Sequence, residues 1–264
     1  MGVVCRPDVP PERLREVVLA TEDAGLDELW LWEDCFWGGA VPACAAALAW
    51  TSRVRVGIGV LPVPLRHVVT NAMDIAMLNR LFPGRPMIGV GHGVQSWMHQ
   101  VGAAAESPMT LLREYLAATR ALLRGEKVTV DGRYVHLDEV TLEWPPSGPV
   151  PVLSAATGDR TLRLSGEAAD GTVLVAGTHP DEVRRARGLI DEGRAAAGRE
   201  DEHRLVVYLP VPGVTDADAT EAAASLHALA AAGADTVILQ SAHAGTPDPM
   251  DLVRFAANQV RPLL

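Results

Sequence analysis

GRPMIGVGHGVQSWMHQVG, residues 84–102, is the stretch from which the fold of this chain can be worked out most directly. Its apolar residues 87–90 predict a buried strand, and the glycines at 89, 91 and 93 predict a tight turn at the end of that strand. Polar and aromatic residues follow, namely His92, Gln95, Ser96, Trp97 and His99. The stretch is therefore either a binding site at the end of a strand or an ordinary turn in which Trp97 covers the core.

Similar pairs of a strand and a helix occur on both sides of this stretch. The expected strands are residues 2–5, 26–32, 53–61, 87–90, 151–155, 171–175, 204–211 and 236–240, and a segment with helical periodicity follows each of them. Most of these strands are continuous apolar runs, as expected when helices cover a parallel sheet. Eight units without a change in composition favour a single (β/α)8 TIM barrel over residues 1–264, in preference to a doubly wound sheet.

One segment departs from this alternation. Residues 127–137 have a strand-like pattern around Asp131-Gly132, a dipeptide favoured in two-residue hairpin turns, and a proline-rich bridge at 145–151 follows. We therefore expect an inserted β-hairpin between the fourth and fifth units.

Composition limits the possible functions. The 264 residues are 48% hydrophobic and 21% charged, which is typical of a soluble globular protein, and no apolar run approaches the roughly 20 residues that span a bilayer. We expect a cytoplasmic protein. The formal charge of -10 disfavours nucleic acid or an anionic membrane as a partner, because both require a basic face. Three cysteines without CxxC spacing argue against a disulfide framework and against a structural zinc site.

The barrel prediction identifies the residues to consider for catalysis, because active sites of TIM barrels lie at the carboxyl ends of the strands. The polar residues in those places are Glu33, Asp34 and Cys35; Arg66 and His67; His92, Gln95, Trp97 and His99; Thr157 and Gly158; Thr178 and His179; and Gln240, Ser241 and His243.

Several known catalytic motifs are missing from this rim. There is no HExxH, GxSxG or Walker A sequence, and a GxGxxG fingerprint starting at Gly89 is interrupted at Val94. We expect no metal, although a hydrolase site formed by Asp34, His92 and His179 is an alternative. Glu33 and Asp34 would raise the pKa of the adjacent Cys35, so a catalytic thiolate is not expected.

The segment 155–158, AATG, joins a strand directly to a helix. Free N–H groups and the positive end of a helix dipole make such a junction a natural phosphate site. The alternative is an ordinary helix start that is capped by Thr157 or Asp159.

Taken together, these segments resemble the bacterial luciferase-like oxidoreductases, a family of TIM barrels that use FMN or the deazaflavin F420. The matching pieces are LDELWLWEDCF from Leu26, VGIGVLPVPLRH from Val56, LFPGRPMIGVGHG from Leu81, DGRYVHL from Asp131, PVLSAATGDRTL from Pro151 and AADGTVLVAG from Ala168. They occur in the family's order over nearly the whole chain.

The resemblance implies a role for several positions. A cis peptide bond at Gly59-Val60, in a bulge that includes Leu61, would support the cofactor ring. Gly91, His92, Gly93 and Gln95 would contact the cofactor, and residues Ala155, Ala156, Thr157 and Gly158 would hold its phosphate. Many F420-dependent members have Asp-His where this chain has Asp34-Cys35, so either Glu33, Asp34 or His92 would have to act as the acid or base, or the reaction needs no strong acid.

The leading hypothesis is an oxidoreductase that transfers hydride between F420 or FMN, with a slight preference for F420, and a small organic substrate. The alternatives are an FMN-dependent monooxygenase supplied by a separate flavin reductase and a barrel that binds the cofactor without catalysis. Only a short loop follows the seventh strand at 210–215, so the substrate pocket is expected to be open or completed by a second subunit. Family habit and exposed apolar helix faces suggest a homodimer.

Overall fold

A closed barrel of eight parallel strands forms the centre of the molecule in the computed structural model, which describes residues 1–264. The strands are β1 (Gly2–Cys5), β2 (Glu28–Leu31), β3 (Arg55–Pro62), β4 (Pro86–Gly91), β7 (Val152–Ala155), β8 (Gly171–Leu174), β9 (Arg204–Val211) and β10 (Thr236–Ser241). Neighbouring strands follow the order β1-β10-β9-β8-β7-β4-β3-β2, and β2 pairs with β1 to close the ring. The predicted (β/α)8 fold is confirmed.

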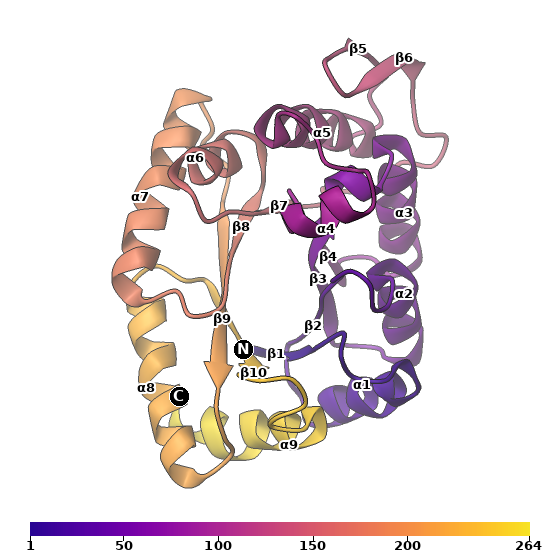
Figure 1. Cartoon of the computed structure of the whole chain (residues 1–264). Coiled ribbons are helices and arrows are strands. Elements are labelled where there is room, and N and C mark those ends of the chain that lie inside the picture. Colours follow the sequence, from indigo (N-terminus) through magenta and orange to yellow (C-terminus); the bar gives the residue numbers. More distant parts are fainter.

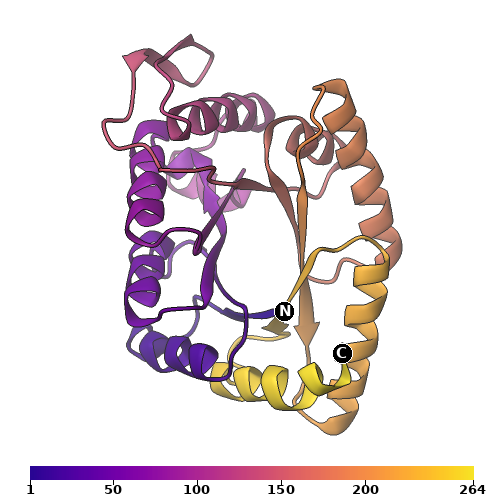
Figure 2. The same ribbon diagram turned by 180° about the vertical axis from the view of Figure 1, so that it is seen from behind.

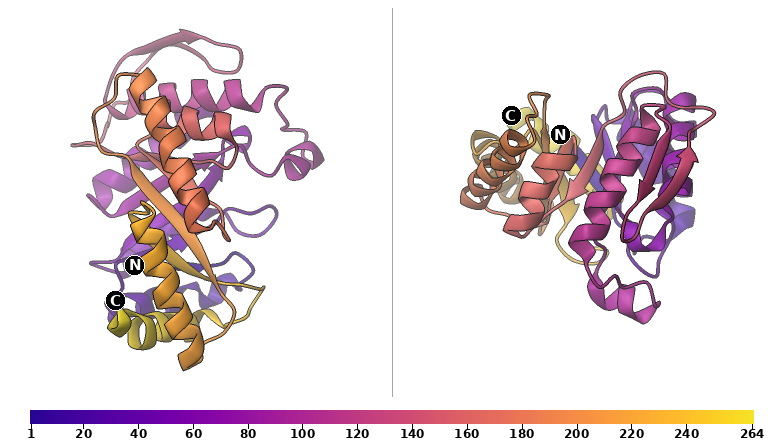
Figure 3. Two further views of the ribbon diagram at one scale, coloured as in Figure 1. Left: turned by 90° about the vertical axis from the view of Figure 1, so that its left-hand side faces the viewer. Right: turned by 90° about the horizontal axis from the view of Figure 1, so that it is seen from above.

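Helices form an outer layer around this barrel (Figures 1 and 2). They are α1 (Leu14–Asp23), α2 (Ala40–Trp50), α3 (Val68–Leu81), α5 (Pro108–Leu123), α6 (Asp159–Ala168), α7 (Pro180–Ala196), α8 (Asp216–Ala231) and α9 (Pro249–Phe255). The short helix α4 (Gln95–Gln100) lies inside this ring of helices in Figure 1. The views in Figure 3 show α7 and α8 running alongside the strands that they cover. None of these helices combines the length and the apolar character needed to cross a membrane.

Two apolar clusters hold the layers together. A cluster of 60 buried residues lies between strands and helices, and a second cluster of 8 fills the barrel itself. The inner cluster consists of Val4, Trp30, Met87, Leu153, Val173, Val206, Tyr208 and Ile238. Glycines in β3 make room for its aromatic members, since a Cβ at Gly57 would lie 2.4 Å from the Trp30 ring and one at Gly59 would lie 1.9 Å from the Tyr208 hydroxyl.

Strands β5 (Val128–Asp131) and β6 (His136–Val140) form a separate antiparallel sheet outside the barrel, beside α5 (Figure 1). Their loop contains four residues because Asp131 pairs with His136, so the two-residue turn predicted from Asp131-Gly132 is wrong. The carboxylate of Glu114 in α5 explains the longer loop: it accepts hydrogen bonds from the backbone N–H groups of residues 133, 134 and 135.

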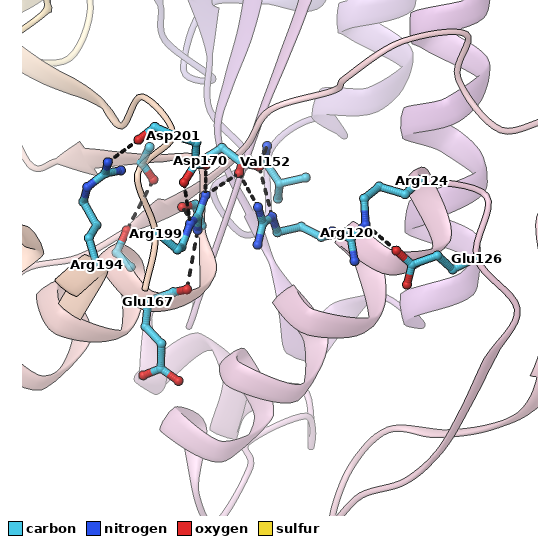
Figure 4. Close-up of polar contacts among 12 residues, drawn as sticks. Arg120, Arg124, Glu126, Val152, Glu167, Asp170, Arg194, Arg199 and Asp201 are labelled. Carbon is cyan, nitrogen blue, oxygen red and sulfur yellow. Dashed lines mark hydrogen bonds and ion pairs between the residues drawn. The ribbon is translucent and has the colours of Figure 1, made fainter. Parts of the chain in front are cut away.

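At the amino ends of the strands, an ion-pair network joins several elements (Figure 4). The carboxylate of Asp170, next to β8, accepts hydrogen bonds from Arg120 of α5, from Arg199 and from the backbone N–H of Val152 in β7. Arg199 also pairs with Asp201. This network fixes the end of the barrel that lies opposite the expected active site.

Candidate active site

The carboxyl ends of the strands surround a mouth whose inner wall is largely aromatic. Trp32 follows β2 and contacts Tyr208 of β9 edge to face, with ring centroids 5.4 Å apart. The guanidinium of Arg6, just after β1, lies 5.4 Å from the Trp32 ring centroid and donates a hydrogen bond to the Ser241 carbonyl at 3.3 Å. Arg6 thereby joins the ends of β1, β2 and β10.

The bulge of β3 forms one side of the mouth. The Gly59-Val60 peptide is cis, as the resemblance implied, and the register against β4 shifts between Ile58 and Leu61. The half-buried Val60 side chain lies over the glycines of β4, because a Cβ at Gly89 or Gly91 would approach it to 2.6 or 2.9 Å. These glycines therefore accommodate the bulge, and contact between Gly91 and the cofactor stays a prediction.

Two other residues of the expected cofactor site have structural roles. Leu61 is 1% exposed and packs in the outer cluster, away from the mouth. Gln95 is exposed, and its side-chain amide donates hydrogen bonds to the carbonyls of His92 and Gly93, each at 3.2 Å. Gly93 has a φ of +70°, a conformation that glycine adopts without strain, so this segment is a turn stabilised by Gln95.

His92 lies on the helix side of this turn. Its Nε2 is 3.5 Å from the Thr161 hydroxyl of α6, and the ring is near the backbone of Pro108 at the start of α5. Burial lowers the pKa of His92, and the Pro108 backbone only partly opposes that effect, so the ring is neutral at pH 7. The expectation that His92 acts as an acid or base at the mouth is not supported by this position.

Glu33 is already engaged by other groups. Its carboxylate accepts hydrogen bonds from Arg66 Nε at 3.1 Å, from Arg66 Nη2 at 2.5 Å and from the backbone N–H of Ala40 at 2.8 Å. Two parallel hydrogen bonds from one guanidinium fix the position of this carboxylate. Glu33 thus links the segments after β2 and β3, a position that does not support the acid or base role expected from the sequence.

Asp34 is the one candidate carboxyl that is left available. It is partly buried, and its carboxyl group makes no hydrogen bond, although its backbone carbonyl accepts one from the N–H of Trp37 at 3.0 Å. Burial is the main reason why its pKa is raised, while Arg6 opposes the shift and Asp8 adds to it. A carboxyl in such surroundings is suited to exchange a proton with a ligand in the mouth.

Cys35 has no sign of nucleophilic activation. Burial, followed by the charges of Glu33 and Asp34, raises its pKa, so the sulfur is a neutral thiol at pH 7. This agrees with the sequence-based expectation for the residue that replaces the family's histidine.

The start of α6 is open at its first turn. Thr157 and Gly158 are exposed, and the N-cap residue Gly158 provides no side-chain cap, so the expected capping by Thr157 or Asp159 does not occur. Asp159 instead pairs with Arg185 of α7. Ala156 is buried and its N–H bonds to the Val173 carbonyl, so a bound anion would be contacted by Thr157 and Gly158 and not by Ala156.

The remaining histidines of the rim do not assemble into a metal site. His67 accepts a hydrogen bond from the backbone N–H of Val69 at the start of α3, and His179 is the N-cap residue of α7. No group of three or more His, Cys, Asp or Glu side chains is arranged to hold a metal ion, so Asp34, His92 and His179 are not brought together.

A cavity of about 1210 Å³ lies at the other end of the barrel. Its charged groups already neutralise one another: Arg120 pairs with Asp170, and both Arg55 and Arg204 pair with Glu28. Most of the charge there is thus already paired, and the chemistry of TIM barrels is found at the carboxyl ends of the strands.

The family model described as "Luciferase-like monooxygenase" matches residues 1–259 of the chain. The chain belongs to this family. Its luciferase-like relatives include a 5,10-methylenetetrahydromethanopterin reductase of Archaeoglobus fulgidus, 30% identical over 97% of this chain and 77% of the relative. An F420-dependent glucose-6-phosphate dehydrogenase of Beutenbergia cavernae is 32% identical over 94% of this chain and 76% of the relative. The reductase of Methanolobus tindarius is 32% identical over 75% of this chain, and the match spans only 60% of that relative.

Solved structures confirm the luciferase-like barrel. An F420-dependent secondary alcohol dehydrogenase, in complex with an F420-acetone adduct, superposes with a TM-score of 0.85 at 19% identity, covering 98% of both chains. The F420-dependent tetrahydromethanopterin reductase from Methanopyrus kandleri has a TM-score of 0.82 at 20% identity, covering 99% of this chain and 98% of that one.

The mouth of this luciferase-like barrel fits a flat ring cofactor by its own chemistry. Large apolar side chains are exposed around it, namely Phe36, Trp37, Val94 and Val175, while Val60 and Ala155 line it. Within the barrel, the Oε1 atom of Gln240 is buried without a hydrogen-bond partner. The Nε1 atom of Trp32 at the mouth is likewise buried without a partner. Apolar side chains beside a few unpaired polar groups are what a ligand site requires.

Sequence reasoning missed several of these residues. Arg6, Trp32 and Tyr208 lie in segments interpreted only as strands or their ends, and Phe36 and Trp37 follow the acidic pair without a recognisable motif. Alternation along β2 was the available signal, because Trp32 lies on the same side of the strand as the buried Trp30.

Proposed function

We propose that this chain is an F420-dependent oxidoreductase that transfers hydride between the cofactor and a small organic substrate at the mouth of the barrel. The observation that carries this proposal is the position of Asp34, a partly buried carboxyl without a hydrogen bond beside an aromatic and aliphatic recess. Similarity to F420-dependent dehydrogenases over 94% of the chain supports F420 as the cofactor.

Each side chain at the mouth has a role in this proposal. Val60 and Ala155 provide an apolar surface for a ring, and the first turn of α6 at Thr157 and Gly158 binds a phosphate through its N–H groups. A carboxyl oxygen of Asp34 exchanges a proton with the substrate, while the exposed rings of Phe36 and Trp37 flank the substrate. When bound, the cofactor would supply the hydride chemistry.

An FMN-dependent monooxygenase, supplied by a flavin reductase as its partner, is the alternative in the same family. Only residues 212–215 lie between β9 and α8, so this loop is too short to cover the mouth. An open mouth is less suited to protecting a reactive oxygen intermediate from water, which favours hydride transfer.

Binding distinguishes the two cofactors. Purified protein is titrated separately with F420 and FMN while the fluorescence of each is recorded, and we expect F420 to bind more tightly. If neither binds with a Kd below about 1 mM, which corresponds to roughly -4 kcal/mol, the proposal is wrong.

A homodimer and a cytoplasmic location complete the proposal. Met73, Met77 and Leu81 form a stripe on α3 in which each side chain is more than half exposed, and a second copy of the chain would cover it. The three cysteines are free, and burial raises the pKa of Cys5 and Cys44 to about 12, as suits a reducing compartment.

A further inference from the structure

Gln240 occupies an unusual position for an amide side chain. It is the second-last residue of β10, at the mouth end of the strand, and only 4% of it is exposed. Successive side chains of a strand point to opposite faces, and Ile238 belongs to the inner cluster, so Gln240 also points into the barrel.

The amide has no partner within the chain. Its Oε1 atom is buried without a hydrogen bond, and its Nε2 atom makes no side-chain bond either. An unsatisfied buried polar group costs about 1–3 kcal/mol, whereas an apolar side chain of the same shape at that position would avoid the cost. The free protein therefore retains a group that destabilises it.

The apolar side chains around Gln240 make its amide selective for the polar atoms of a ligand. Ile238 precedes it by two residues on the same face of β10 and is paired with Tyr208 of β9, whose hydroxyl already donates a hydrogen bond to the Gly59 carbonyl, at 3.4 Å. In a recess of this kind, a single amide determines which polar atom of a ligand can be buried.

We propose that the side-chain amide of Gln240 binds the imide edge of the cofactor ring. Flavins and deazaflavins share this edge, in which a ring N–H lies between two carbonyls, and a glutamine amide presents the complementary pair, one acceptor beside one donor. This inference rests on the proposed cofactor and adds the residue that recognises its polar edge. It also explains why a destabilising amide is present in the barrel.

The test compares Gln240→Met, a substitution of similar size, with the wild type. FMN and F420 binding is measured by fluorescence titration, and the melting temperature of the cofactor-free protein is measured in parallel. We expect affinity for both cofactors to fall about tenfold to a hundredfold, while the melting temperature is unchanged or higher. A purely structural glutamine would lower the melting temperature instead.

A modified ligand tests the same contact from the side of the cofactor. 3-Methyl-FMN lacks the imide N–H, so it should bind the wild type more weakly than FMN does, and the difference should disappear in Gln240→Met. Equal affinity of the wild type for FMN and 3-methyl-FMN would overturn the proposal, as would unchanged cofactor affinity in the variant.

The chain provides a matched control in Gln259, which also has a buried Oε1 atom without a partner but lies in the C-terminal helical segment. Gln259→Met should leave cofactor affinity unchanged. Equal losses in both variants would contradict a specific contact at Gln240. If the wild type itself binds neither cofactor, the proposed function fails at that step, before any variant is compared.

Discussion

Glu33 and Asp34 are adjacent carboxylates with opposite surroundings. Arg66 and the N–H of Ala40 satisfy the first, while the second is partly buried without a hydrogen bond. This difference is the reason why we propose a structural role for Glu33 and proton transfer for Asp34, a division that the residue types alone do not reveal.

Asp34→Asn tests the proton-transfer role. We expect kcat to fall by about 10²–10⁴, the usual contribution of general acid-base catalysis. Because the folded protein raises the pKa of Asp34, it binds more protons than the unfolded chain in that range, and ionisation of Asp34 lowers stability as the pH rises. The variant should therefore be at least as stable as the wild type at pH 7, as measured by urea denaturation, and an unchanged kcat would contradict the role.

His203 predicts a second dependence on pH. It is buried, its Nε2 lies 2.8 Å from the Thr172 hydroxyl, and burial, with help from three arginines, lowers its pKa from 6.5 to about 4. The unfolded chain binds the proton first as the pH falls, so stability is lost between about pH 6.5 and 4. His203→Gln should reduce this slope by up to about 1.4 kcal/mol per pH unit in urea denaturation followed over that range; an unaltered slope would show that other groups cause it.

The sequence predicts where a candidate residue lies along the chain better than where its side chain points. Asp34 was identified correctly as a rim residue. His92 and Leu61 were expected at the cofactor site as well, but the side chain of His92 faces the helices and that of Leu61 packs in the outer cluster. Both directions depend on the bulge of β3 and the turn at Gly93, which are determined by contacts between strands. Gln240 was noted only as one of many polar residues, because an unpaired atom is a property of the folded state.

Among the secondary-structure elements, those joined by Asp170 should be the most sensitive to substitution. Its carboxylate connects α5, β7 and the segment before β9, and its side chain is 18% exposed. Asp170→Ala leaves Arg120 and Arg199 without a counter-charge, so the free energy of unfolding should fall by about 3 kcal/mol.

A matched control is Glu192→Ala, which breaks the pair with Arg163 on the exposed surface. Such pairs contribute about 0–1 kcal/mol, so its unfolding curve should nearly overlay that of the wild type. Similar losses in the two variants, measured by denaturant unfolding, would show that Asp170 has no special role.

Most elements were predictable because they depend on local pattern. The eight strands and the long helices follow from apolar runs and periodicity, with boundaries displaced by one or two residues at several ends. Helix α4 (Gln95–Gln100) and the four-residue hairpin loop were not predicted, since the short helix lacks a periodic apolar face and the loop is held by the distant Glu114.

For the whole molecule, the exposed stripe on α3 leads to a prediction about assembly. Met77→Glu would place a charge in the centre of the proposed dimer interface, where burial of an unpaired charge is costly. Light scattering should show a dimer for the wild type and a monomer for the variant. Glu221→Gln on the exposed face of α8 serves as a control and should remain dimeric, whereas a monomeric wild type would contradict the assembly.

The contact made by Arg6 implies that the site is completed late in folding. Its hydrogen bond to Ser241 connects residues 235 positions apart, across the seam where β10 docks on β1. Trp32 and Gln240 lie on either side of the same seam, so a chain whose last strand has not yet docked lacks half of the recess. Ring closure and ligand binding are thus thermodynamically linked: a bound cofactor selects the closed barrel over its opened form, and recovery of binding during refolding marks the moment at which the first and last strands meet.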